Sequence, residues 1–330
     1  MRARLAEAAA HRGRRFLEWT PAGPCSYNPY GRGGETEIAD RLLAGERFTE
    51  PHYLRQAQRY LGHAIRALRS CGRDVDLAAV VQMLDPSALE VLLREAEPER
   101  AAEGHAYVDS LTERQLRDLA GVRDRLAILR ESEVGRWLGA GFDLLEACRE
   151  GSVVLFGLEA DSRPLLTQMI GAAIVQDLQS TVAALQVAPA PTLVVIDEFS
   201  ALGARHVTAL FGRARSAGVS LLLGTQELAD LRLPGAERLL EQVLGNVSLL
   251  LAHRQVVPDS AELISRLAGT RGCWRVSWGN GGRTTRTRAS EPVLDPEALM
   301  ELAPGSAVAI GFGAGREASL VQVSPAGGER

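Results

Sequence analysis

Two adjacent carboxylates, Asp197 and Glu198, close the apolar run TLVVID that begins at Thr192. A short apolar run followed by a helical segment predicts a buried strand of an α/β sheet, and such sheets bind ligands at the carboxyl ends of their strands. In a nucleoside triphosphatase the first carboxylate of such a pair holds Mg²⁺, usually through water, and the second accepts a proton from the attacking water. The alternative is that both carboxylates precede a helix, whose dipole favours negative charge.

Polar residues around the next apolar run, VSLLLGTQ from Val219, favour the nucleotide interpretation. Gln226 ends this run, where a neutral donor senses a γ-phosphate or orients water, although a lone glutamine also serves as a helix cap. Arg213 and Arg215 precede the run at the end of a helical segment, where the helix dipole favours cations. A ring-forming ATPase uses an arginine at such a position to reach a neighbour's phosphates.

Three regions with different patterns must position these residues. Residues 1–35 combine a short helix with an extended piece and predict a residual part of a nucleotide-binding core. Residues 36–140 have apolar residues at helical spacing and predict an all-α subdomain of about five helices. Residues 141–330 alternate apolar runs with helices, which is typical of a mostly parallel sheet buried on both faces. The runs begin at Ser152, Thr192, Val219 and Val247, and one or two closing strands follow near 307–311 and 319–323.

Composition places the chain among soluble globular proteins, since 46% of its 330 residues are hydrophobic, 24% are charged and the net charge is −4. All 37 basic residues counted as lysine or arginine are arginine, which excludes a Schiff-base lysine and the lysine of a P-loop. The 4 cysteines lie far apart, so reduced thiols are expected rather than a zinc site or a disulfide framework. No apolar stretch reaches the ~20 residues of a membrane span, and we expect the chain as given to be cytoplasmic.

A basic, aromatic segment between Thr270 and Ala289 surrounds a glycine-rich turn signal at 279–282 and predicts a hairpin. Arginines pair with phosphates and indoles stack on bases, so this composition suits single-stranded DNA. A solvated edge hairpin protected by its charges is an equally good interpretation. The candidate DNA contacts are Arg283, Arg286 and Arg288, and the segment also contains Arg271, Arg275, Trp274 and Trp278.

Two separated stretches resemble one known family. PTLVVIDEFSALGARHVTALFGRARSAGVSLLLGTQELADL with GNVSLLLAHRQVVPDSAELISRLAGT is similar to the type IV secretion coupling proteins, the TraD/TraG/VirD4 group of DNA-transfer ATPases. YNPYGRGGETEIADRLLAGERFTEPHYLRQAQRYL, residues 27–61, is similar to the stretch of that family that enters its all-α domain. The resemblance covers about residues 12–271 and implies a RecA-like P-loop NTPase core with an inserted all-α subdomain.

The resemblance also implies roles for single residues. Asp197 matches the metal-coordinating aspartate, Glu198 the catalytic glutamate and Gln226 the glutamine of the third motif. Arg215 best matches the arginine finger, with Arg213 as the fallback, and Arg254 stands where the family also tends to carry an arginine. The implied cofactors are ATP and Mg²⁺. The implied partners are single-stranded DNA, relaxosome or substrate proteins bound by the all-α subdomain, and other copies of the chain in a hexamer at the inner membrane.

The sequence departs from the family by having no P-loop strand with its lysine and no transmembrane helices. We therefore expect a core without its first P-loop strand and no hydrolysis by this chain alone, because the groups that hold the β- and γ-phosphates are missing. Nucleotide would bind only if a missing N-terminal part or a partner supplies a P-loop, and membrane association would likewise depend on that part. Three interpretations fit these observations. The chain is a shortened form, or it is half of a split ATPase. Alternatively, it is a non-catalytic subunit that binds DNA or relaxosome proteins, or that completes or regulates a partner's site.

Overall fold

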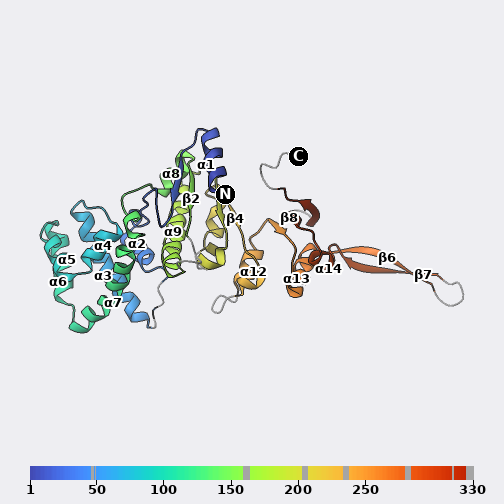
Figure 1. Ribbon diagram of the computed structural model, residues 1–330. Helices are drawn as coiled ribbons and strands as arrows, with labels where there is room; N and C mark the ends of the chain where they lie inside the picture. The colour runs from blue at the N-terminus through green and yellow to red at the C-terminus, as the bar shows by residue number, and fades with distance from the viewer. Residues whose placement is uncertain are drawn as a thin grey trace. The chain divides into compact units, whose positions relative to one another are not determined.

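The computed structural model describes residues 1–45, 48, 50–158, 164–202, 207–232, 238–278, 284–313 and 316–324. The chain divides into two compact units, residues 1–224 and 225–330 (Figure 1). Within the described part of the chain, no helix combines the length and the apolar character needed to span a membrane.

Helices dominate the first half of the first unit. They are α1 (Arg2–His11), α2 (Glu35–Leu42), α3 (Pro51–Ser70), α4 (Leu77–Met83), α5 (Pro86–Leu93), α6 (Pro98–Asp109), α7 (Glu113–Glu131) and α8 (Leu144–Glu150), with the 3-10 turn η1 (Gly135–Trp137). Prolines begin α3, α5 and α6, where a missing N–H costs nothing. Six α-helices therefore begin between residues 35 and 131, where the periodicity predicted about five, and the described residues of 36–140 form no strand, as predicted.

Two short strands flank helices α2 to α8 in sequence. Strand β1 (Phe16–Trp19) pairs in parallel with β2 (Val153–Phe156), with Phe16 opposite Val153. Helices α2 to α7 therefore lie in sequence between two neighbouring strands. A parallel pair requires a crossover connection, and here that connection contains the helical segment.

The second parallel pair in this unit carries the carboxylates. Helix α9 (Pro164–Leu185) leads into β3 (Thr192–Ile196), which pairs in parallel with β4 (Val219–Leu223). The turn η2 (Phe199–Leu202) and the four-residue helix α11 (Phe211–Ala214) lie between them.

One face of this pair is open, which corrects the expectation of a sheet buried on both faces. Leu193 and Val195 are 65% and 58% exposed, and Leu222, opposite Val195, is 52% exposed. The inward-facing Ile196 and Val219 are buried. Helix α11 contacts β4 and α9, and α9 contacts the turn η2, so α11 packs against this pair.

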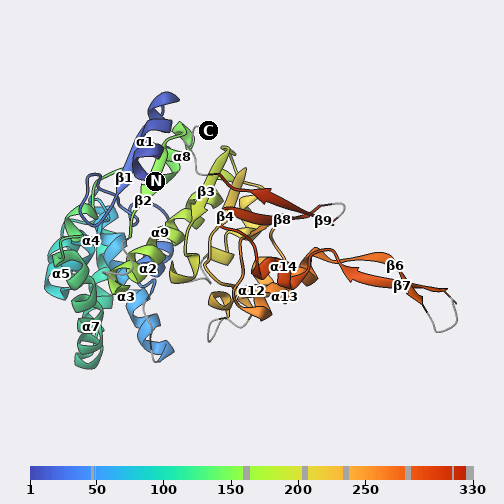
Figure 2. The same ribbon diagram turned by 45° about the vertical axis from the view of Figure 1, so that its right-hand side comes forward.

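The second unit is mainly antiparallel. It contains η3 (Leu228–Leu231), α12 (Leu239–Leu244), β5 (Leu249–Ala252), α13 (Pro258–Ala268), β6 (Thr270–Trp278), β7 (Thr284–Pro292), α14 (Pro296–Met300), β8 (Ser306–Phe312) and β9 (Arg316–Gln322). Strand β5 was expected to join a parallel sheet, but it pairs antiparallel with β8, which in turn pairs with β9. Strands β6 and β7 form the predicted hairpin, which Figure 2 shows extending away from α13 and α14; its predicted turn lies outside the described residues.

One continuous hydrophobic core joins the helical segment to α9. It runs from Trp19 and Tyr27 through α2 to α7 and includes Ile170 and Ile174 of α9. Trp19 is fully buried, and its indole N–H donates to the carbonyl oxygen of Trp137 at 2.9 Å. The helices therefore pack on the strand–helix core as one body, since they share its interior.

A buried ion pair reinforces this junction between α2 and α9. Arg41 is 1% exposed and Asp177 4% exposed, and their Nη1 and Oδ1 atoms lie 3.1 Å apart. The Tyr27 hydroxyl donates to Asp177 Oδ2 at 2.6 Å, and Arg41 Nη2 donates to Ser180 Oγ at 2.9 Å. Burial raises the pKa of Asp177, and the nearby Arg41 guanidinium opposes that rise. A charged pair of this kind holds the two helices in one register because either charge alone would be costly to bury.

Candidate nucleotide site

Asp197 and Glu198 lie at the carboxyl end of β3, as the sequence predicted, and both side chains are exposed. Glu198 has φ of 50°, and among the described residues other than glycine no other has a positive φ. This left-handed conformation costs energy for a residue with a Cβ and turns the chain sharply after the strand. The turn lets the Glu198 N–H donate to Asp197 Oδ1 at 3.1 Å, which orients the aspartate.

Gly224 completes this corner, and sequence analysis did not identify it as a site residue. It follows β4, donates its N–H to the Ile196 carbonyl at 2.8 Å and accepts from the Phe199 N–H at 3.3 Å. A Cβ at this position would lie 2.7 Å from Asp197 Oδ1. The carboxylate therefore occupies space that only a glycine leaves open. The available signal was a glycine directly after the strand that follows the carboxylate pair.

The arrangement suits a hard cation held through a single carboxylate. Mg²⁺ is usually bound by one or two carboxylates together with waters and phosphate oxygens. Within the described residues no three His, Cys, Asp or Glu side chains gather as a metal site, so a cage made of protein ligands alone is not formed there. Asp197 is exposed, is oriented by a backbone N–H and faces the Gly224 backbone, so it fits a Mg²⁺ site made of one carboxylate, waters and phosphate oxygens.

The two candidate arginine fingers lie at the other end of the same strand pair. Arg213 is in the last turn of α11 and Arg215 is its C-cap, and both are exposed. They precede β4, whereas the carboxylates follow β3, and the two strands are parallel. The length of a five-residue strand, on the order of 13–16 Å, therefore separates them from the carboxylates of their own chain.

The remaining predicted residues lie in the second unit. Gln226 is exposed two residues beyond Gly224, and Arg254 is exposed after β5. Arg286 and Arg288 are on β7, and Arg283 lies outside the described residues. The structure thus brings Asp197, Glu198 and Gly224 together, and it does not bring Arg213 or Arg215 to them.

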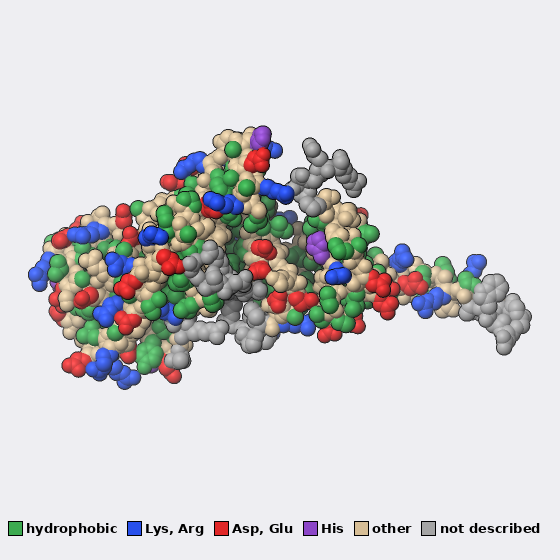
Figure 3. All heavy atoms as spheres, viewed as in Figure 1, with side chains coloured by type: hydrophobic (Ala, Val, Ile, Leu, Met, Phe, Trp, Pro, Cys, Tyr) green, Lys and Arg blue, Asp and Glu red, His purple; other side chains and the backbone are tan. Residues whose placement is uncertain are grey.

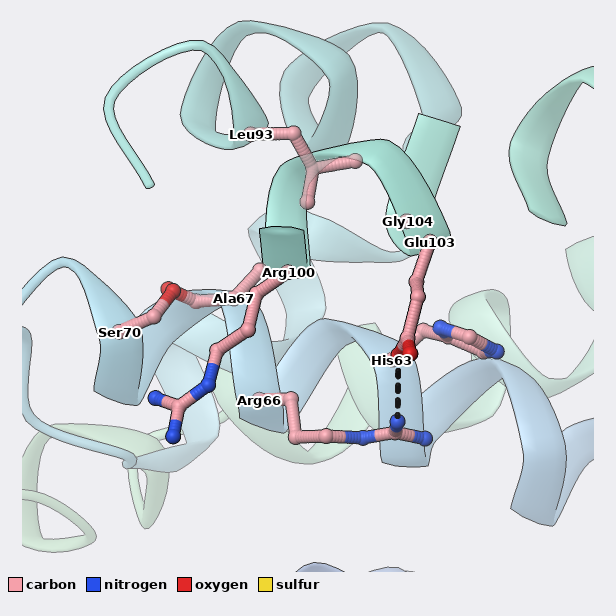
Figure 4. Close-up of a pocket in the computed structure, with 8 residues that line it drawn as sticks. All are labelled: His63, Arg66, Ala67, Ser70, Leu93, Arg100, Glu103 and Gly104. Carbon is pink, nitrogen blue, oxygen red and sulfur yellow. Dashed lines mark hydrogen bonds and ion pairs between the residues drawn. The ribbon is translucent and has the colours of Figure 1, made fainter. Parts of the chain in front are cut away.

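A small pocket between α3, α5 and α6 is not a nucleotide site. Figure 4 shows Arg66 and Glu103 facing each other across it, 3.7 Å apart. Its volume of about 20 Å³ has room for a water molecule, whereas ligand pockets are typically several hundred Å³. His63 at its edge stacks on Tyr107, and burial with the nearby Arg66 and Arg59 lowers its pKa to about 4. The pocket residues therefore stabilise helix packing.

Comparisons with known proteins concern the family and the fold. Residues 191–304 match the family model described as the TraM recognition site of TraD and TraG. An uncharacterized protein of Mycoplasma pneumoniae (strain ATCC 29342 / M129 / Subtype 1) is 30% identical over 101 residues, which are 30% of this chain and 67% of that protein.

Solved structures of a conjugative coupling protein and of VirB4 share the fold. The bacterial conjugative coupling protein TrwBdeltaN70 in its unbound monoclinic form has a TM-score of 0.70 at 14% identity, covering 97% of this chain and 80% of its own. The plasmid coupling protein TrwB in complex with ADP and Mg²⁺ has a TM-score of 0.66 at 13% identity over the same shares of 97% and 80%. VirB4 of Thermoanaerobacter pseudethanolicus follows with 0.59 at 14% identity, over 97% of this chain and 79% of its own. Residues 191–304 thus match a recognition region of TraD and TraG, and the chain shares the fold of solved conjugative coupling proteins.

Proposed function

We propose that this chain is part of a conjugative DNA-transfer coupling ATPase, in which Asp197 holds Mg²⁺ through water and Glu198 accepts the proton of the attacking water. The observation that carries the proposal is the corner at the end of β3, where Asp197 faces the Gly224 backbone and is oriented by the Glu198 N–H. A Mg²⁺ ion held by Asp197 would supply positive charge that stabilises the transition state of phosphoryl transfer. Two solved TrwB complexes, with ADP and Mg²⁺ and with the ATP analogue ADPNP, support a nucleotide as the ligand.

The chain on its own is proposed to be inactive. Its sequence contains no lysine, so the cation that grips the β- and γ-phosphates in a P-loop must come from another segment or polypeptide. Removing preorganised charge of this kind suppresses turnover by orders of magnitude. Asp197 and Glu198 therefore act in a composite site, with Gln226 as the proposed water-orienting or phosphate-sensing residue.

A second candidate function is a non-catalytic subunit that donates Arg215 to a neighbour's site. The topology favours it, because Arg215 lies at the opposite end of the β3–β4 pair from the carboxylates of its own chain. An arginine finger supplied by a neighbour raises turnover by about 10³–10⁵. In a homo-hexameric ring, which the resemblance implies, the two functions combine, since each Arg215 then serves the next subunit.

One ATPase experiment separates these functions. The chain is assayed alone and mixed with a P-loop chain of the same family, using wild type, Glu198→Gln and Arg215→Ala. We expect no turnover alone and stimulated turnover in the mixture. Loss of the stimulated turnover with Glu198→Gln supports the composite site. Loss of that turnover with Arg215→Ala but not with Glu198→Gln supports the donor function. Hydrolysis by the isolated chain, or stimulation that survives both substitutions, contradicts the proposal.

The recognition of relaxosome proteins has two candidate surfaces. The all-α subdomain, residues 36–140, is the one that the resemblance implies, whereas the family model named for TraM recognition matches residues 191–304. We propose the second surface, because its match is to a named recognition region. Cross-linking of the full chain to a TraM protein, followed by mass spectrometry, should place the cross-links in 191–304, and cross-links confined to 36–140 would reverse the assignment.

A further inference from the structure

The two strands of the β6–β7 ribbon place different side chains on its two faces. In an antiparallel pair, residues directly opposite each other share a face, and successive pairs alternate between faces. Trp274 is opposite Arg288 and Val276 is opposite Arg286, so these residues share one face. Arg275 is opposite Thr287 and Arg271 is opposite Glu291, and those pairs lie on the other face.

The first face, called here the tryptophan face, consists of Trp274, Val276, Arg286 and Arg288. Trp274 is 68% exposed and Val276 46% exposed, and both arginines are exposed. A Cβ on Gly272 would lie 3.7 Å from Arg288 Nε, so the Arg288 side chain extends along this face beside Trp274. Basic and apolar side chains are visible along the ribbon in Figure 3.

The second face is partly neutralised. Arg275 Nε lies 3.4 Å from Glu291 Oε1, and Glu291 is the sole acidic residue in the described strands 270–278 and 284–292. In the same described strands, neither Arg286 nor Arg288 has an acidic partner. Positive charge on the tryptophan face is therefore available to an anionic ligand.

We propose that the tryptophan face binds single-stranded nucleic acid, with a base stacked on Trp274 and backbone phosphates paired with Arg286 and Arg288. Indoles stack on any base, and guanidinium groups bind phosphate oxygens, so this pairing needs no base sequence. Bases in a duplex are already stacked on one another, which excludes them from the indole. The proposal rests on the proposed function only for identifying the strand as transferred DNA.

The exposed indole distinguishes this proposal from a purely protective role of the charges. Arginines alone would keep the ribbon edges from pairing with other strands. The Trp274 indole beside them is 68% exposed, and such an apolar surface would favour association instead of preventing it. Charge complementarity favours a polyanion over a protein partner, because two uncompensated arginines flank the small apolar area.

Binding of a fluorescently labelled 20-nucleotide oligo(dT) to the full chain, followed by anisotropy, tests the proposal. Loss of one stacked base corresponds to about a 5- to 150-fold weaker affinity, so we expect Trp274→Ala to weaken binding at least fivefold and Trp274→Phe to retain most of it. Replacing Arg286 and Arg288 with alanine should lower the slope of log affinity against log salt by about 1.4, at 0.7 per phosphate contact. Arg275→Ala is the matched control, since it removes a ribbon arginine that is paired on the other face.

Equal effects of Trp274→Ala and Arg275→Ala overturn the proposal, as does an absence of oligo(dT) binding by the wild-type chain. Tighter binding of duplex than of oligo(dT) overturns the stacking step. A change of oligomeric state with Trp274→Ala, without a change in DNA affinity, assigns the face to another copy of the chain instead. Nucleotide assays with the same variants separate the two proposals, because Trp274→Ala should leave stimulated ATP turnover without DNA unchanged.

Discussion

Breaking the buried Arg41–Asp177 pair should destabilise the first unit strongly. In Arg41→Ala, Asp177 remains 4% exposed next to Tyr27 but loses the guanidinium 3.1 Å from its Oδ1 atom. Removing one partner of a buried pair typically costs about 3–5 kcal/mol, because an uncompensated charge stays in the interior. We therefore expect the free energy of unfolding at pH 8 to fall by about 3–5 kcal/mol.

The pH dependence of this loss is the sharper test. Burial raises the pKa of Asp177 in the folded chain above its value in the unfolded chain, and Arg41 opposes that rise. Without Arg41 the folded-state pKa rises further, so protonation favours the folded variant. A group of this sign contributes stability below its unfolded pKa and loses it as pH rises through its folded pKa. The deficit of Arg41→Ala should therefore shrink between pH 8 and pH 5.

Urea unfolding followed by circular dichroism measures both quantities. Arg66→Ala is the control at pH 8, since Arg66 pairs with Glu35 at 3.6 Å and Glu103 at 3.7 Å and its side chain is 43% exposed. An exposed pair is worth about 0–1 kcal/mol. The reasoning is refuted if Arg41→Ala costs no more than Arg66→Ala, or if its deficit grows towards acid pH.

Three further substitutions test other parts of the structure. Gly224→Ala places a Cβ 2.7 Å from Asp197 Oδ1 and should displace that carboxylate, weakening Mg²⁺-dependent binding of a fluorescent ADP analogue by the P-loop mixture, whereas Gly212→Ala, with open space around it, should not. His63→Phe keeps the stack on Tyr107 but removes a group whose folded pKa, about 4, lies below its unfolded value. Such a group destabilises the folded chain as pH falls from about 6.5 to 4, because the unfolded chain then binds the proton more readily. The melting temperature of the variant should therefore drop less than that of wild type over this range. In helix α6, Gly104→Ala collides with Leu93 and should cost about 1–3 kcal/mol, while Gly121→Ala in α7 meets nothing and should stabilise by about 0.5–1 kcal/mol, as measured by urea unfolding; equal effects would contradict the packing.

Local patterns predicted most of the elements. Short apolar runs alternating with helical segments predicted β2, β3, β4 and β5, and proline at helix starts predicted α3 and α5. Such signals depend on residues near in sequence, so they need no knowledge of the partner. Strand partners are different: β5 has the same apolar character as β3 but pairs antiparallel with β8. An apolar run does not encode which strand lies beside it.

The candidate site divides in the same way. Asp197 and Glu198 were predicted because a carboxylate pair after an apolar strand is a local signal that chemistry explains. Gly224 was missed because its importance depends on the ladder that brings it to Asp197. The separation of Arg215 from the carboxylates could not be predicted from their spacing in the chain, since it follows from the parallel pairing of β3 with β4.

By itself the sequence determined which groups this protein can use: two carboxylates after a strand, arginine as its basic side chain, and no lysine for a P-loop. Residue types decide what bonds and charges are possible, whatever the fold. The tertiary structure decided which of these groups meet, pairing Arg41 with Asp177 across two helices and Asp197 with the Gly224 backbone, and gathering Trp274 with Arg286 and Arg288 on one face of a ribbon. Contacts between residues far apart in sequence depend on strand register and shared burial, which only the packed chain specifies.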